Sequence, residues 1–282
     1  MLPRRSLFAI AASAAALALL ATPTHRAHAV GADVPLFDAH VHWSENAHEE
    51  IPLERALQIL DKAGVRMAAV SSTSDEATIK LYRADPKRVV PMLRPYRTRS
   101  DMGGWHNDAS IPPYLAERLK LGVHKGIGEF HLFGGQTSTA VVRRLTELAV
   151  QRNLYLHAHS DDLAVVELFT LEPRIKVIWA HAGMSAGPTV VGPLLDRYPS
   201  LWVDLALRNG DVAPGGTLDP AWRALFIRHP DRFLAGTDTW VTSRWEDLQP
   251  SMRAVQDWLA QLPPAVAEKI AHGNGERLFP SR

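Results

Sequence analysis

The sequence contains no cysteine, so no disulfide bond can stabilise the folded chain. Stability must come instead from a buried apolar core, which a chain of 282 residues is long enough to build. After the first 29 residues, no apolar run approaches the roughly 20 residues that a membrane-spanning helix requires. We therefore expect no membrane anchor in the remainder of the chain.

The sequence also lacks an excess of positive charge outside its first 29 residues. Those residues contain three of the 31 basic side chains and no acidic ones, which leaves 28 basic against 30 acidic residues. A general nucleic-acid-binding surface requires a basic excess, so we expect no nucleic-acid partner. A small-molecule substrate is the expected partner, and assembly into a homo-oligomer stays open.

The first 29 residues are typical of a cleavable export signal. Arg4 and Arg5 precede fifteen almost wholly apolar residues, 7–21, and residues 27–29 form a small-residue cleavage triplet. The paired arginines are typical of a twin-arginine signal, and general secretion is the alternative route. Cleavage would leave residues 30–282 as the mature protein, in the periplasm or secreted.

Short apolar segments alternate with helical patterns along residues 30–282, without a repeat or linker between them. Eight strands are predicted, at residues 36–41, 65–71, 89–93, 126–130, 154–159, 176–180, 201–205 and 233–237. Helical patterns fall between them, including residues 53–63, 139–151, 190–198, 220–229 and 246–262. This alternation predicts an α/β fold, a single-domain (β/α)8 TIM barrel. The alternative is an open doubly wound sheet, but no glycine-rich fingerprint follows the first strand.

Histidines and acids cluster at the carboxyl ends of the predicted strands, where this type of barrel places its chemistry. Residues two apart on a strand point the same way, so His40 and His42 can bind one cation. A single histidine at a strand end is more often structural, but the joint pattern predicts a divalent metal site. The ligands that this pattern predicts are His40, His42, His159, His181 and Asp238.

These residues resemble the amidohydrolase superfamily, in particular its amidohydrolase-related branch. The resemblance covers essentially residues 30–282 and includes the closing segment 270–279, with its Gly-Asn-Gly-Glu-Arg-Leu-Phe. It implies that His40, His42 and either His159 or His181 bind metal. It also implies that Asp238 binds the metal and takes a proton from the attacking water. Zinc suits the imidazole ligands, although manganese, iron and cobalt tolerate the same set.

Glu129 determines the expected number of ions. In the two-metal branches an acid or a carboxylated lysine on the fourth strand bridges the ions, and Glu129 resembles the glutamate of the metal-dependent deoxyribonuclease branch. We therefore favour two ions over one. The alternative is that Glu129 orients a ligand histidine. We expect His157 to lie deeper than His159 as a supporting or core residue, and Asp38 to anchor the ring of His40.

The loops after the strands present aromatic and cationic side chains, of which Trp43, Arg94, His131 and Trp240 are the candidate substrate contacts. The alternative is that the aromatic side chains simply cap the barrel. The predicted function is a metal-dependent hydrolase that uses a metal-activated water to cleave a small ester, lactone or amide. A metal-dependent decarboxylase of an aromatic acid is one alternative, favoured by a single metal and a pocket arginine. A phosphoesterase or nuclease is another.

Overall fold

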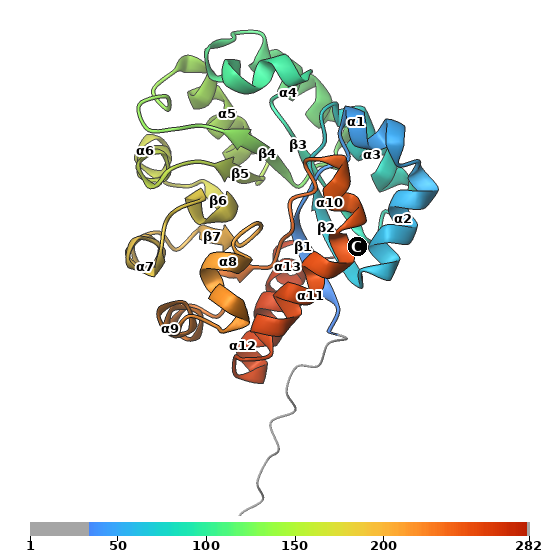
Figure 1. The fold of residues 1–282 in the computed structure, drawn as a ribbon. Helices are drawn as coiled ribbons and strands as arrows, with labels where there is room; N and C mark the ends of the chain where they lie inside the picture. Colours follow the sequence, from blue (N-terminus) through green and yellow to red (C-terminus); the bar gives the residue numbers. More distant parts are fainter. Residues whose placement is uncertain (1–33, 281–282) are drawn as a thin grey trace, which may run out of the picture.

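The protein is a (β/α)8 barrel in a computed structural model that describes residues 34–280 (Figure 1). Eight parallel strands form one sheet in chain order. They are β1 (Leu36–Val41), β2 (Val65–Val70), β3 (Val89–Leu93), β4 (Gly126–His131), β5 (Tyr155–His159), β6 (Lys176–Trp179), β7 (Leu201–Asp204) and β8 (Phe233–Leu234). The predicted fold class and the positions of the eight predicted strands are confirmed, although the bounds of several strands differ from those predicted. The predicted export signal lies outside the described residues.

Helices surround the strands, as Figure 1 shows. They are α1 (Glu45–Glu50), α2 (Leu53–Lys62), α3 (Asp75–Ala84), α4 (Ile111–Arg118), α5 (Ala140–Gln151), α6 (Asp162–Leu171), α7 (Pro188–Arg197), α8 (Asn209–Val212), α9 (Pro220–Arg228), α10 (Thr242–Glu246), α11 (Leu248–Leu259), α12 (Pro264–Glu268) and α13 (Asn274–Leu278). Across residues 34–280, none of these helices is long and apolar enough to cross a membrane.

Local sequence explains why these helices form where they do. Helix α2 buries Ala56, Ile59 and Leu60, whose spacing of three and four residues puts them on one face against the strands. Helix α5 is capped by Thr139, which precedes it and whose side chain accepts a hydrogen bond from the backbone N–H of Val142. An amphipathic face and an N-terminal cap therefore account for these two helices of the outer layer.

Strand β8 ends at Leu234, three residues earlier than predicted. Thr237 donates its backbone N–H and its hydroxyl to the carboxylate of Asp38, at 3.0 and 2.6 Å, instead of pairing with a strand. The ring is completed by backbone hydrogen bonds of 2.8 Å from Ala39 to Ala235 and from Asp238 to His40. The carboxyl end of the barrel is therefore held by side-chain contacts that sequence patterning does not reveal.

The interior of the barrel divides into two parts. An apolar cluster that includes Phe37, Met67, Val90, Ile178 and Phe279 fills the part nearest the amino ends of the strands. The part at the carboxyl ends is occupied by buried polar side chains instead, among them His40, His42, His157, His181, Asp204 and Glu129. The fold thus encloses charged and imidazole groups at the end where chemistry is expected.

Candidate metal centre

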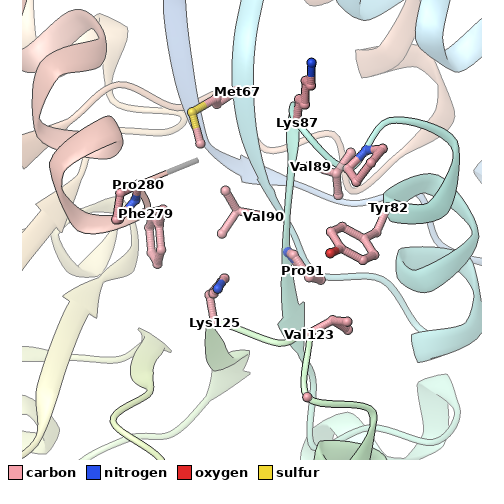
Figure 2. Close-up of a pocket in the computed structure, with 12 residues that line it drawn as sticks. Met67, Tyr82, Lys87, Val89, Val90, Pro91, Val123, Lys125, Phe279 and Pro280 are labelled. Carbon is pink, nitrogen blue, oxygen red and sulfur yellow. The ribbon is translucent and has the colours of Figure 1, made fainter. Parts of the chain in front are cut away.

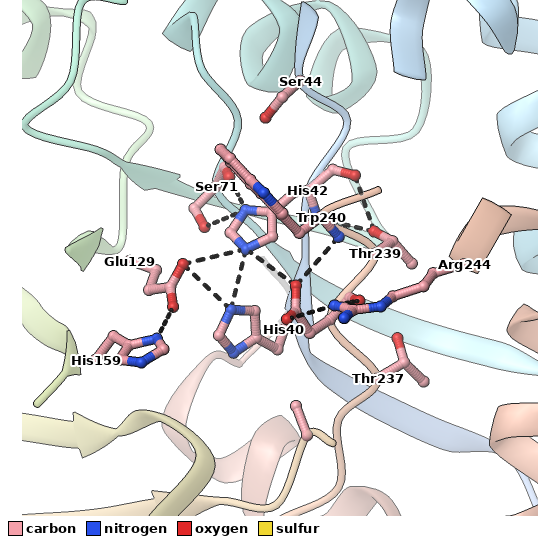
Figure 3. Close-up of polar contacts among 12 residues, drawn as sticks. His40, His42, Ser44, Ser71, Glu129, His159, Thr237, Thr239, Trp240 and Arg244 are labelled. Carbon is pink, nitrogen blue, oxygen red and sulfur yellow. Dashed lines mark hydrogen bonds and ion pairs between the residues drawn. The ribbon is translucent and has the colours of Figure 1, made fainter. Parts of the chain in front are cut away.

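Four histidines lie around one carboxylate at the carboxyl end of the barrel. Figure 3 shows three of them, His40, His42 and His159, beside Glu129. His40 lies near the end of β1 and His42 directly follows the strand, and their Nε2 atoms lie 3.0 Å apart. Oε2 of Glu129, from β4, is 3.5 Å from the first of these nitrogens and 3.2 Å from the second. Its other oxygen, Oε1, is 2.9 Å from Nδ1 of His159 and 3.5 Å from Nε2 of His181. The structure therefore brings together these five predicted ligands.

Asp238 completes the cluster from the segment after β8. Its Oδ1 is 3.5 Å from Nε2 of His42, and its Oδ2 accepts a hydrogen bond of 2.9 Å from Arg244. Asp238 has a φ of 65° and His181 a φ of 56°, the left-handed region that non-glycine residues rarely adopt. Such conformations persist where surrounding contacts enforce them, and they concentrate at functional sites.

The ring nitrogens that face away from the cluster are held by acceptors. Nδ1 of His40 donates to Asp204 at 3.0 Å, and Nδ1 of His181 donates to the carbonyl of Ala206 at 2.9 Å. Nδ1 of His42 donates to the carbonyl of Ser71. Each acceptor fixes the ring so that Nε2 points into the cluster. Metal-binding histidines have this arrangement, so the residues present fit a divalent cation.

Asp204 is the main site residue that the sequence prediction missed. It is fully buried at the end of β7. Its Oδ2 accepts from His40 and, at 2.7 Å, from Nε2 of His157, while Oδ1 accepts from the backbone N–H of Ala206 at 2.9 Å. The expectation that Asp38 anchors the ring of His40 is wrong, because Asp38 is bonded to backbone N–H groups and Thr237. His157 has the expected supporting position.

Charges within the cluster stabilise one another. Burial by itself disfavours charge on His40, yet the carboxylates of Glu129 and Asp204 raise its pKa well above the ordinary histidine value. Burial likewise opposes ionisation of both acids, but the charge on His40 and hydrogen bonds from neighbouring histidines lower their pKa values well below the ordinary range. Burial lowers the pKa of His42. The carboxylates are therefore ionised and ready to bind a cation.

The four candidate substrate contacts differ in burial: Trp43 and Arg94 are buried, whereas His131 and Trp240 are half-buried. Trp43 is fully buried and donates its indole N–H to Ile51 at 3.0 Å, so it packs in the core, which corrects the expectation that it meets substrate. Arg94 is also buried, and it donates to Oε2 of Glu129 at 3.2 Å. The arginine therefore holds the central carboxylate and presents no open guanidinium to a pocket.

His131 and Trp240 lie at the edge of the cluster, half-buried. Nδ1 of His131 is 3.1 Å from the hydroxyl of Tyr96, and its ring stacks on His159 with centroids 4.3 Å apart. Burial lowers the pKa of His131 to about 4, so its ring stays neutral near pH 7. The ring of Trp240 stands edge-on to His42, 5.4 Å away.

A cavity of about 320 Å³ opens beside Trp240. Its lining includes Arg99, Ser44 and Thr73, together with residues 241–243. The guanidinium of Arg99 lies 5.4 Å from the Trp240 ring, and that of Arg94 lies 4.9 Å from it. Arg99 was not singled out in the sequence, because one arginine in a long loop gives no signal of its own. The cavity combines an aromatic wall with one cation next to the metal centre.

Comparisons with known proteins agree with this geometry. The sequence profile of the amidohydrolase family matches residues 37–281. A search of curated proteins finds no match. Solved structures with a similar fold include a probable 2-pyrone-4,6-dicarboxylic acid hydrolase from Acinetobacter baumannii, crystallised with citric acid (14% identity, 86% of this chain and 98% of that chain, TM-score 0.56). A TatD family hydrolase from Entamoeba histolytica has 11% identity, covers 88% and 99% of the two chains and has a TM-score of 0.58. N-isopropylammelide isopropylaminohydrolase from Burkholderia multivorans has 13% identity, and the match covers 87% of this chain and 75% of that chain with a TM-score of 0.54.

Proposed function

Because the chain belongs to the amidohydrolase family, we propose that this hydrolase uses a bound divalent metal to cleave a small ester, lactone or amide. One observation carries the proposal. The Nε2 atoms of His40, His42 and His181 point at the carboxylate of Glu129, and each ring is fixed by an acceptor at its other nitrogen. Imidazole and carboxylate ligands of this kind suit zinc, which is the proposed ion.

We propose two ions bridged by Glu129. This is supported by the two carboxylate oxygens, which face different histidines: Oε2 lies near His40 and His42, whereas Oε1 lies near His159 and His181. A single-ion centre is the alternative, and Arg94 is the observation that favours it. Its guanidinium, 3.2 Å from Oε2, already supplies one positive charge at this carboxylate.

When bound, the metal supplies Lewis acidity and lowers the pKa of water, so that hydroxide is available near neutral pH. The residues of the chain handle the proton. Asp238 faces the histidine cluster with Oδ1, while Arg244 engages Oδ2. We assign Asp238 as the base that takes the proton from the attacking water and passes it to the leaving group.

The cavity beside Trp240 supports a small substrate with an acidic substituent. Its volume of about 320 Å³ suits a compact molecule. A flat ring can pack on Trp240, and a carboxylate can pair with Arg99. The favoured substrates are therefore small lactones or esters that carry a carboxylate. Decarboxylation of an aromatic acid is the second candidate, and it goes with the single-ion alternative.

The proposal is tested by assaying zinc-loaded and chelator-treated protein on lactones, esters and amides with and without a carboxylate. We expect turnover only in the loaded protein, with the carboxylate-bearing substrates preferred. Asp238→Asn should lower kcat by about 10²- to 10⁴-fold, the usual contribution of a general base. Asp211→Asn is the matched control, because Asp211 is exposed and its ion pair within residues 34–280 is with Arg208. Equal turnover in wild type and Asp238→Asn would contradict the assignment.

We also propose that the protein is exported and that residues 1–29 are removed. The arginine pair, the apolar run and the small-residue triplet in the sequence support this. Intact mass measurement of the protein recovered from the periplasm of a bacterial host should show a chain that begins at residue 30. Recovery of full-length chain only in the cytoplasm would contradict it.

A further inference from the structure

Two cavities adjoin at the amino-terminal end of the barrel, opposite the metal centre. The larger, of about 580 Å³, is lined by residues at the starts of β4, β5 and β6 and by the segment 277–280. The smaller, of about 310 Å³, is lined by residues around the start of β3 (Figure 2). Both linings include Gly122, Lys125, Phe279 and Pro280, so the two cavities share a wall.

Positive charge recurs around these cavities. Each strand from β3 to β6 begins at or just after a cationic residue that lines one of them: Lys87, Lys125, Arg152 and Lys176. Because parallel strands of a barrel begin at the same end, the four cations converge there. Arg277 of α13 adds a fifth. Among the described residues, no aspartate or glutamate lines either cavity.

Two acidic residues in the same loops pair with cations outside the cavities, and a third pairs with a cation of the cavity lining. Asp85 binds Arg88 at 3.1 Å, and Glu172 binds Arg174 at 2.7 Å. Asp231 pairs with Arg277 at 2.9 Å, but it is shared with Lys269 at 3.0 Å. The described residues that line the two cavities therefore carry more positive than negative charge, and low-dielectric walls lined by one sign of charge concentrate the potential inside.

Lys176 illustrates how the cations are presented. Its Nζ donates to the carbonyl and the side-chain oxygen of Asn153, at 2.7 and 2.9 Å, and lies 4.1 Å from the centre of the Tyr155 ring. Partial burial lowers the pKa of this lysine. Neutral oxygens and a ring face orient the ammonium group without neutralising it, so a bound anion would still gain from it.

The walls between the cations are apolar. Figure 2 shows Met67, Val90 and Phe279 around the smaller cavity, with Lys125 at its edge. The ring of Phe279 also meets Tyr155, which lines the larger cavity, with centroids 5.0 Å apart. The combined space therefore offers aromatic and aliphatic surface next to several cations.

We propose that these cavities bind a small soluble organic anion, which carries two or more carboxylate or phosphate groups on an apolar body, at a site separate from the metal centre. The acid groups pair with Lys176, Arg277 and Arg152, and the apolar body packs against Tyr155 and Phe279. Barrels of this type carry out chemistry at the carboxyl ends of the strands, so a ligand at the amino ends is bound and not transformed.

The test uses naphthalenetrisulfonate, an aromatic polyanion that is a poor metal ligand, in calorimetric titrations of the full protein. We expect one molecule bound per chain, with affinity that falls as salt is added. Lys176→Gln combined with Arg277→Gln should weaken binding by at least about tenfold, because two charge-assisted contacts are lost. Metal content should be unchanged in this variant.

The matched control is Arg144→Gln combined with Arg223→Gln, which removes the same charge from the exposed faces of α5 and α9. Binding should stay within about twofold of wild type, since the charges removed are screened by solvent. Equal weakening in both double variants would show that the probe responds only to net charge, and would overturn the proposal. Absence of saturable binding would overturn it too. If the first variant fails to fold, Lys87→Gln combined with Arg152→Gln replaces it.

Discussion

The two ends of this barrel are built from the same eight strands but hold different chemistry. At the carboxyl ends, buried histidines and carboxylates satisfy one another, with Asp204 and Glu129 at the centre. At the amino ends, Phe37 and Phe279 stack within an apolar cluster, and the cations lie around the rim. Apolar packing fills the barrel interior near the amino ends. The carboxyl ends hold polar and charged groups, whose burial would be unfavourable if they did not pair with one another.

We expect substitutions at the carboxyl ends of the strands, called the polar end below, to affect both the free energy of unfolding and metal binding. Asp204→Ala should lower the free energy of unfolding by about 3–5 kcal/mol, because His40 and His157 lose their buried partner. It should also weaken metal affinity about 10- to 100-fold. Urea unfolding and metal titration measure the two effects.

The control for this change is Asp211→Ala. Asp211 is exposed and forms an ion pair of 2.8 Å with Arg208, so its loss should change the free energy of unfolding by less than about 1 kcal/mol. If Asp204→Ala were no more destabilising than this control, Asp204 would not organise the polar end.

At the amino end, a substitution should affect stability alone. Gly275→Ala places a Cβ atom 2.1 Å from Cγ of Phe37, so the apolar cluster must shift. We expect the free energy of unfolding to fall by about 1–3 kcal/mol with unchanged metal content. Gly273→Ala is the control, because its nearest contact would be 3.5 Å, an ordinary separation. A change in metal content in Gly275→Ala would show that the two ends are not independent.

The smallest effect concerns His131, at the edge of the polar end. Its pKa of about 4 in the folded protein lies below the unfolded value of 6.5, so the folded state binds the proton less tightly. Wild type should therefore lose stability as pH falls below 6.5, by about 1.4 kcal/mol per pH unit and about 2 kcal/mol by pH 5. His131→Gln removes this contribution.

The measurement is urea unfolding of chelator-treated wild type and His131→Gln at pH 7.5 and pH 5. The stability difference between the two proteins should shift by about 2 kcal/mol between these conditions, in favour of the variant at pH 5. Parallel pH dependence would mean that His131 titrates normally in the folded state.

At the polar end, the candidate metal ligands could be predicted from the sequence, but the residue that holds the ring of His40 was missed. His40 and His42 are separated by one residue at a strand end, a pattern visible in the sequence. Asp204 is one acid in an otherwise apolar strand, and its contact with His40 spans 164 positions. A search of the other strand ends for an acid that could hold the second nitrogen of His40 would have found Asp204, because Asp204 is the last residue of β7.

The remaining errors have similar physical causes. Trp43 follows His42 directly, which favours a place at the site, but its ring turns into the core toward Ile51. The eighth strand was predicted too long, because the apolar pattern continues after the chain has turned aside to meet Asp38. Sequence patterns indicate strands and ligands. The orientation of Trp43 and the end of β8 depend instead on hydrogen bonds with residues that the pattern does not identify.

The most direct test of the proposed metal centre is elemental analysis of the purified protein beside its Glu129→Gln variant. We expect two zinc ions per chain in wild type and one in the variant, because Glu129 faces both pairs of histidines. Glu147→Gln, which changes an exposed partner of Arg144, should retain two. One ion that is unaffected by Glu129→Gln would contradict the bridge, and no bound ion after zinc loading would contradict the metal centre itself.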